Sequence, residues 1–203
     1  MCIRDRCVTS SEPTMLEPHG AGTGQRCQQL TSGLLIRPAR TSDVAAIRAL
    51  CQPLIDERIL VPKDHVNYFE NIQEFMVVTD PDGTLAGCAA LHVFWEDLAE
   101  VRTVATSAQF RRRGVGRALI ESLLQRAKDL GVDRVFCLTF ERDFFASLGF
   151  EQITGTPVSP EVFAELLRSQ DEGTAEFLDL ARVKPNTLGN YRMMVSLGQA
   201  ENA

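Results

Sequence analysis

The sequence predicts an α/β (α+β) fold with a mixed, mostly antiparallel central sheet and flanking helices. Three strand-like runs follow one another between residues 75 and 106, which is typical of antiparallel pairing. A strand, a long amphipathic helix and a second strand then occupy 99–140, and such a crossover joins parallel neighbours. One parallel pair is therefore expected inside an otherwise antiparallel sheet.

The N-terminal elements follow from their cap and breaker residues. A short strand is expected over 34–39, followed by a helix over 41–52 whose first residues, Thr and Ser, can cap it. Pro53 either ends or kinks this helix, because proline lacks the backbone N–H that a helix interior uses. Residues 54–73 favour a second short helix and a loop, a frequent place for substrate contacts.

A hairpin comes next in the chain. Strands are expected at 75–79 and 84–95, joined by the turn DPDG at 80–83. Pro81 suits the second position of such a turn, and Gly83 tolerates a positive φ.

The centre of the chain holds the crossover. A strand over 99–106 leads through the basic loop 107–117 into a helix at about 114–130, where apolar residues recur at four-residue intervals. Gly131 closes that helix, and a strand over 132–140 follows.

The C-terminal part is read in the same way. Residues 142–150 predict a short helix, and Ser159-Pro160 begins another, with proline at the first helical position. A loop containing KPNTLGN (184–190) leads to a last strand over 191–197.

The chain divides into three parts. Residues 1–33 are rich in Gly, Ser, Thr and Pro and are predicted to be disordered. The opening MCIRDR resembles translated sequencing-adapter sequence, so part of this segment is treated as non-native and carries no functional weight. Residues 34–154 form the predicted core, and 155–203 form an extension that completes the sheet and the acceptor side.

Composition excludes several classes of protein. The 203 residues fit one domain, and the net charge of -6 argues against a dedicated nucleic-acid binder. No stretch approaches the ~18 apolar residues of a membrane span. The six cysteines lack CxxC spacing and the three histidines lie apart, so no metal is expected. With no secretory leader visible, we expect a cytoplasmic location.

The segment that carries chemistry is VRTVATSAQFRRRGVGRALIESLL, in which a strand enters a basic, glycine-bearing turn that opens into a helix. The unpaired N–H groups of a helix start bind anions, and glycine lets a phosphate approach the backbone. Arginines add bidentate phosphate donors. The spacing differs from that of Walker and dinucleotide loops. The residues concerned are Arg111, Arg112, Arg113, Gly114, Gly116 and Arg117.

This segment resembles the Q/R-x-x-G-x-G/A loop of the GCN5-related N-acetyltransferase (GNAT) superfamily. The resemblance covers about 34–154 and implies that the loop, including Val115, binds the pyrophosphate of acetyl-CoA. It also implies that the strand before the loop diverges from its parallel neighbour. The pantetheine arm would lie in that gap, beside Val104, Ala105 and Thr106, with Phe144 as a channel wall.

A narrower resemblance extends through the C-terminal part to about Met194. The segments LHVFWEDLAEVRTVAT, LTFERDFFASLGF and GTPVSPEVFAELLRSQDEGTAEFLDLARVKPNTLGNYRM look like the short, actinobacterial-type amino-acid N-acetyltransferases. Those enzymes act as N-acetylglutamate synthases at the start of arginine biosynthesis. The resemblance implies direct transfer of acetyl from acetyl-CoA to the α-amino group of L-glutamate. A homodimer is kept open as an additional expectation.

The resemblance and the chemistry together suggest roles for individual residues. Glu100 is the candidate base, and the backbone N–H near Val104 is the expected oxyanion donor. Arg102 lies two residues after Glu100 and so shares its strand face; we expect it to bind an acceptor carboxylate. Lys184 and Arg192 are further carboxylate candidates.

Several alternatives stay open from the sequence. Glu100 and Arg102 can instead form a structural ion pair. Many superfamily members have a tyrosine where this chain has Phe144-Phe145, so the general acid is unassigned; Thr139, Cys137, Tyr191 and water are the candidates. The acceptor can be another amino acid, a polyamine or a peptide terminus, and a non-catalytic acetyl-CoA sensor is the rival outside enzymes.

Overall fold

A computed structural model describes residues 28–30, 32–169, 174, 178 and 189–198 of the chain. Within these residues one eight-stranded sheet is formed, in the order β1-β2-β3-β4-β5-β6-β8-β7. Neighbouring strands are antiparallel except β5 and β6, which are parallel. The predicted fold class is therefore confirmed. The strands are β1 Gln28–Gln29, β2 Leu35–Pro38, β3 Phe75–Thr79, β4 Leu85–Trp95, β5 Leu98–Thr106, β6 Arg134–Thr139, β7 Glu151–Gln152 and β8 Tyr191–Ser196.

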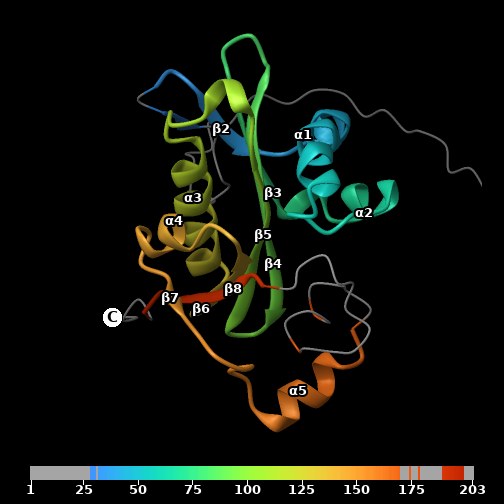
Figure 1. The fold of residues 1–203 in the computed structure, drawn as a ribbon, viewed down its shortest axis with the longest axis vertical. Helices are drawn as coiled ribbons and strands as arrows, with labels where there is room; N and C mark the ends of the chain where they lie inside the picture. The colour runs from blue at the N-terminus through green and yellow to red at the C-terminus, as the bar shows by residue number, and fades with distance from the viewer. Residues whose placement is uncertain (1–27, 31, 170–173, 175–177, 179–188, 199–203) are drawn as a thin grey trace, which may run out of the picture.

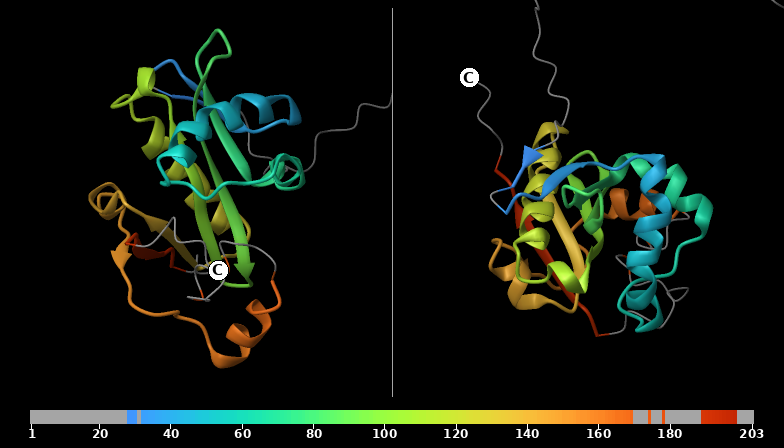
Figure 2. Two further views of the ribbon diagram at one scale, coloured as in Figure 1. Left: turned by 45° about the vertical axis from the view of Figure 1, so that its right-hand side comes forward. Right: turned by 90° about the horizontal axis from the view of Figure 1, so that it is seen from above.

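The helices pack on both faces of this sheet, with α3 and α4 on one face and α1 and α2 on the other (Figure 1). Viewed from above, the sheet separates the two helical layers (Figure 2). The helical elements are η1 Thr41–Asp43, α1 Val44–Asp56, α2 His65–Glu70, η2 Ile72–Glu74, η3 Ala108–Phe110, α3 Val115–Asp129, α4 Arg142–Ala146 and α5 Pro160–Leu166.

Each layer has its own apolar core. On the first face, Leu119, Ile120 and Leu123 of α3 are fully buried against apolar residues of β2 to β6. On the other face, Ile47 and Cys51 of α1 pack on β3, β4 and β5. The four-residue spacing that predicted the long helix is therefore the spacing of its buried stripe.

Three local expectations need correction. Helix α1 continues through Pro53 to Asp56, so of the two outcomes left open at Pro53, an end or a kink, the structure excludes the end; the backbone N–H of Glu57 still binds the Pro53 carbonyl. Proline removes only its own N–H from the ladder, and the following turn survives. Gln28 and Gln29 form β1 against β2, so order begins before Leu34. The two-residue strand β7 was missed because it is too short to show a period.

The C-terminal part of the chain contributes a strand to the sheet. Strand β8 lies between β6 and β7, and pairs antiparallel with both. Ahead of it, the Ser159 side chain caps α5 by accepting from the Val162 N–H at 3.3 Å. Leu166 of α5 joins Phe94 and Phe136 in a third apolar cluster. Residue Lys184 lies outside the described residues, as does most of 1–33.

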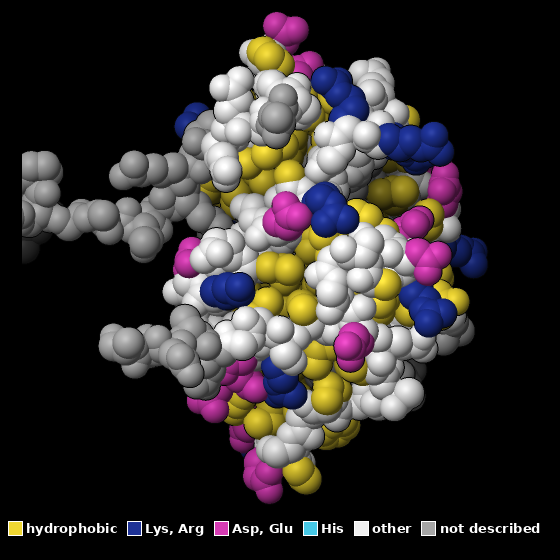
Figure 3. All heavy atoms as spheres, turned by 90° about the vertical axis from the view of Figure 1, so that its left-hand side faces the viewer, with side chains coloured by type: hydrophobic (Ala, Val, Ile, Leu, Met, Phe, Trp, Pro, Cys, Tyr) yellow, Lys and Arg dark blue, Asp and Glu magenta, His cyan; other side chains and the backbone are white. Residues whose placement is uncertain are grey.

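The surface carries mixed charge on the face that holds α3 and α4. Basic and acidic side chains are interspersed there, with apolar groups between them (Figure 3). No helix among the residues described is both long and apolar enough to cross a bilayer.

Candidate functional site

The candidate site lies where the two parallel strands separate. Strands β5 and β6 pair only from Leu98 with Arg134 to Glu100 with Phe136. Strand β5 continues for six residues beyond Glu100, while β6 turns toward β8 and pairs with it along its whole length. The family resemblance implied this divergence, and it leaves an opening between neighbouring strands of one sheet.

A β-bulge on β5 lies inside that opening. Cys88 pairs with Ala105 and Ala90 pairs with Arg102, so one residue of β4 faces two residues of β5, Thr103 and Val104. Thr103 has a φ of 54°, a left-handed conformation that a β-branched side chain rarely adopts. A bulge takes its extra residue out of the ladder and redirects the backbone. The bulge includes Val104, the predicted oxyanion donor, which lines the cleft.

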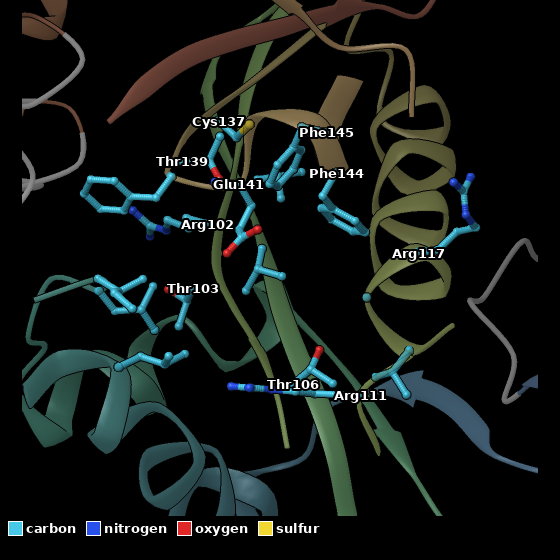
Figure 4. Close-up of a pocket in the computed structure, with 18 of the residues that line it drawn as sticks. Arg102, Thr103, Thr106, Arg111, Arg117, Cys137, Thr139, Glu141, Phe144 and Phe145 are labelled. Carbon is cyan, nitrogen blue, oxygen red and sulfur yellow. The ribbon is translucent and has the colours of Figure 1, made fainter. Parts of the chain in front are cut away.

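The cleft has a volume of about 760 Å³. Its walls come from the end of α1, the C-terminal half of β5, the loop into α3, the end of β6 and α4. Figure 4 shows Thr103 and Thr106 along β5, with Cys137 and Thr139 across the gap. Residues of the 54–73 segment also line it: Leu54, Glu57, Ile59 and Leu60.

The glycine-and-arginine loop opens onto this cleft. Gly114 has a φ of 78° and precedes the 15-residue helix α3, and a side chain added there would meet open space. The first N–H groups of α3 therefore lie exposed beside the cleft, where a helix carries partial positive charge. Arg111, Arg112 and Arg117 line the same cleft and supply full charges.

The remaining predicted cofactor residues divide into two groups. Val104, Thr106, Val115, Gly116 and Phe144 line the cleft. Gly116 lies directly against Phe144, since a Cβ at Gly116 would be 3.3 Å from the ring.

Two members of the predicted set lie elsewhere. Ala105 is buried in the core under α1 and is absent from the cleft wall. The Arg113 guanidinium stacks over the Phe110 ring, 5.2 Å from its centroid, and also does not line the cleft.

The predicted base and carboxylate ligand lie at the closed end of the divergence. The Glu100 side chain is 6% exposed and the Arg102 side chain 8% exposed. Arg102 Nη1 lies 4.0 Å from Glu100 Oε2. Arg102 lines the cleft, whereas Glu100, two residues earlier on β5, does not. A buried carboxylate beside a cleft is suited to accepting a proton from a bound molecule.

Glu74 and His92 join this pair, and sequence reasoning did not find Glu74. Arg102 Nη2 donates to Glu74 Oε2 at 3.0 Å, and His92 Nδ1 lies 2.7 Å from Glu74 Oε1. Burial acts to raise the pKa of Glu74, but hydrogen bonds and positive charge from His92 and Arg102 leave that pKa below its ordinary value. Separations of 18 and 28 residues leave no local signal for such a contact.

The weaker candidates lie away from the cleft. Arg192 is on β8, and its guanidinium donates to the Gly155 carbonyl at 3.3 Å. Tyr191 is half-exposed beside Arg142. Of the candidate acids that line the cleft, burial, with the nearby charge of Glu100, raises the pKa of Cys137, so its thiol is a poor proton donor. Thr139 also lines the cleft, and its hydroxyl accepts from the Glu141 N–H at 2.9 Å.

Metal-ligating side chains do not gather in the part of the chain that the structure describes: no group of three or more could hold an ion. The cleft therefore combines a helix start and arginines suited to anion binding with Arg102 and the buried Glu100 carboxylate beside it.

The fold and this cleft together define a protein of the acetyltransferase class. A family model described as Acetyltransferase (GNAT) family matches residues 44–150, which include the bulge, the loop and α3. The chain belongs to this family.

Relatives of the chain are amino-acid acetyltransferases. It is 52% identical over 165 residues to the amino-acid acetyltransferase of Mycobacterium tuberculosis, covering 80% of this chain and 94% of the relative. It is 36% identical over 136 residues to that of Neisseria meningitidis serogroup A, covering 66% of this chain and 30% of the relative.

Solved structures agree with this assignment. Rv2747 from Mycobacterium tuberculosis, in complex with CoA and NLQ, superposes with a TM-score of 0.76 at 52% identity, covering 79% of this chain and 98% of that one. N-acetylglutamate synthase from Neisseria gonorrhoeae, complexed with coenzyme A and N-acetyl-glutamate, gives 0.65 at 25% identity, covering 81% and 35%.

Proposed function

We propose that this chain is an amino-acid N-acetyltransferase that transfers acetyl from acetyl-CoA to the α-amino group of L-glutamate. The observation that carries the proposal is the cleft between the diverging strands, whose walls include the glycine-and-arginine loop and Arg102, with the buried Glu100 carboxylate 4.0 Å behind Arg102. Relatives with 52% and 36% identity are amino-acid acetyltransferases, and one solved neighbour carries N-acetyl-glutamate. The enzymes that the chain resembles form N-acetylglutamate as the first step of arginine biosynthesis.

Binding of the co-substrate is assigned to the α3 loop. The backbone N–H groups from Gly114 to Arg117 take the pyrophosphate, and Arg111 and Arg112 add charge from the cleft wall. The absence of side chains at Gly114 and Gly116 lets the phosphates reach the backbone. The pantetheine arm then follows the gap beside Val104 and Thr106.

Transfer begins when the acceptor amine attacks the thioester carbonyl. A C–N bond forms, the C–S bond breaks, and the backbone N–H near Val104 stabilises the negative charge that develops on oxygen. Glu100 takes the proton that the amine loses, directly or through a water. The thiolate leaves as such or takes a proton from Thr139 or water.

Acceptor recognition is assigned to Arg102, whose guanidinium lines the cleft next to Glu100. A planar guanidinium binds carboxylate bidentately, so it favours an acidic acceptor over a polyamine. Arg192 and Lys184 remain secondary candidates for a second carboxylate. The free thiols of Cys51, Cys88 and Cys137 fit the reducing cytoplasm that we propose as the location.

A coupled thiol-release assay tests the proposal. Acetyl-CoA is offered with a panel of amino acids, a polyamine and a peptide with a free N-terminus, and the released thiol is measured. We expect saturable turnover with L-glutamate at the highest kcat/KM of the panel. Turnover only with a polyamine or a peptide would show that L-glutamate is not the acceptor. Saturable acetyl-CoA binding without turnover of any acceptor would show that the protein is an acetyl-CoA sensor and not an acetyltransferase.

A further inference from the structure

Four polar side chains form a row on one face of the sheet, next to the cleft. Glu74 ends η2 just before β3, His92 is on β4, and Arg102 and Glu100 are on β5. The register places His92 opposite Glu100 and Ala90 opposite Arg102, so the row runs from the residue before β3 across β4 to β5. We call this row the Glu74–Glu100 network.

The guanidinium of Arg102 lies between two carboxylates but is not equidistant from them. Arg102 Nη2 is 3.0 Å from Glu74 Oε2, whereas Arg102 Nη1 is 4.0 Å from Glu100 Oε2. All three side chains are at least 86% buried, so the contact that Arg102 keeps is strong and selective. A carboxylate in close contact with a guanidinium is a weaker base than one held further away.

His92 fixes Glu74 from the other side. His92 Nδ1 lies 2.7 Å from Glu74 Oε1 and 3.0 Å from Arg102 Nη2. Because the Glu74 carboxylate only accepts, the 2.7 Å contact requires that His92 Nδ1–H donates to Glu74 Oε1, and Nδ1 then accepts nothing from Arg102. Both oxygens of Glu74 are then bound, and its direction is set by two neighbours.

We propose that Glu74 is a positioning residue for the acceptor: by binding Arg102 and His92 it holds Arg102 at the cleft wall and keeps Glu100 as the base. The proposal rests on the proposed function and adds a residue that touches neither substrate. Glu74 takes the close contact with the guanidinium, which would otherwise be made by Glu100. One carboxylate thus orients the guanidinium, and the other accepts the amine proton.

Among the described residues, charged and titratable groups from several elements lie near Glu100. They include Arg102 on the same strand, His92 opposite it on β4 and Cys137 on β6, and Glu74 from η2 is linked to it through Arg102. The Arg126 side chain on α3 adds a positive charge near Glu74. Removing the charge of Glu74 leaves the positive groups in place, so Glu100 would bind its proton less tightly.

The test is Glu74→Gln, which keeps the shape and removes the charge. We expect the acceptor KM to rise about 10- to 100-fold, the range expected when a hydrogen bond to a charged group is lost. The KM for acetyl-CoA should stay unchanged, and the acidic limb of the kcat/KM profile should move to lower pH. The matched control is Asp43→Asn, which breaks the Arg37–Asp43 ion pair of 2.7 Å away from the cleft.

A second variant keeps the proposal testable if Glu74→Gln fails to fold. His92→Gln retains an amide donor near Glu74 and should move both the acceptor KM and the acidic limb in the same direction, by a smaller factor. Either variant behaving like Asp43→Asn, with an unchanged acceptor KM and pH profile, would overturn the positioning role. Failure of the proposed function is a separate result, because wild-type protein would then acetylate no amino acid.

Discussion

Glu100 and Phe136 form the last register pair between β5 and β6. Up to this pair the two strands form an ordinary parallel ladder, and after it they diverge around the cleft. The buried carboxylate therefore stands where the sheet opens, and the bulge at Thr103 follows three residues later. A divergence placed elsewhere along β5 would separate the carboxylate from the bulge.

The first prediction concerns the base itself. Glu100→Gln keeps the volume of the side chain but cannot accept the amine proton, so kcat should fall by about 10²- to 10³-fold, as for loss of a general base. The acidic limb of the pH–rate profile should also change. Steady-state thiol release at several pH values measures both. Asp97→Asn, which removes the ion pair with Arg134, is the control; unchanged kinetics for Glu100→Gln would remove it from the mechanism.

A second prediction concerns acceptor recognition by Arg102. Replacing Arg102 with alanine removes the guanidinium at the cleft wall, so the L-glutamate KM should rise at least about tenfold. Binding of acetyl-CoA, measured by calorimetry, should stay intact because Arg102 lies apart from the α3 loop. Equal losses of acetyl-CoA and glutamate binding would instead indicate a general structural role in the Glu74–Glu100 network.

The third prediction separates space from backbone strain in the loop. At Gly116 an added Cβ would lie 3.3 Å from the Phe144 ring, whereas at Gly114 it meets open space but the φ of 78° disfavours any side chain. Gly116→Ala should therefore weaken acetyl-CoA binding, and Phe144→Leu should restore part of it. Gly114→Ala should lower the free energy of unfolding by about 1 kcal/mol.

Calorimetric titration measures acetyl-CoA binding, and urea unfolding measures stability, for Gly116→Ala, Gly114→Ala and each of them combined with Phe144→Leu. The double variant with Phe144→Leu distinguishes the two mechanisms, since a smaller ring cannot relieve a strained φ. Rescue of Gly114→Ala by Phe144→Leu would contradict the explanation.

The fourth prediction concerns how α3 approaches the sheet. A Cβ at Gly87 on β4 would lie 2.6 Å from Val115 Cγ1 and 3.0 Å from the Ala105 carbonyl oxygen. Gly87→Ala should therefore overpack the interface and lower the free energy of unfolding by about 1–3 kcal/mol in urea titrations. Adding Val115→Ala should recover part of the loss, although the backbone contact remains. An unchanged midpoint would show that α3 moves away without cost.

The loop and its helix could be predicted from the sequence because their signals are local. Gly114, Gly116 and the arginines act within one turn of chain, and a helix start needs no distant partner to bind an anion. The crossover likewise follows from a run of elements, which fixes a parallel pair before any contact is known. The divergence of β5 and β6 entered through the family resemblance.

Glu74 could not be predicted in this way. It precedes β3 by one residue and reads as a surface glutamate in a loop, while its partners lie 18 and 28 residues further on. Only the register between β3, β4 and β5 brings them together. At Pro53 the opposite holds. Its local signal allowed the helix to end there, but burial of the helix face on the sheet outweighs that signal and α1 continues to Asp56. Arg113 satisfies the loop pattern, yet its guanidinium stacks on Phe110.

The last prediction concerns stability against pH at the Arg37–Asp43 ion pair, whose atoms lie 2.7 Å apart. The hydrogen bond from Arg37 holds the pKa of Asp43 below its ordinary value, although burial opposes this. The unfolded chain therefore takes up the proton at higher pH than the folded one. The stabilising effect of the ion pair is complete above the ordinary pKa range of a carboxyl group, and it is lost as pH falls through the pKa of Asp43 in the folded protein.

Asp43→Asn should accordingly be less stable than wild type at pH 7, and the difference should shrink on acidification toward about pH 3. Urea unfolding at several pH values measures the difference. Glu165→Gln is the control, because its ion pair with Arg168 is largely exposed and contributes little. A difference between Asp43→Asn and wild type that stays constant or grows at low pH would mean that packing, and not the charge of Asp43, stabilises this corner of the fold.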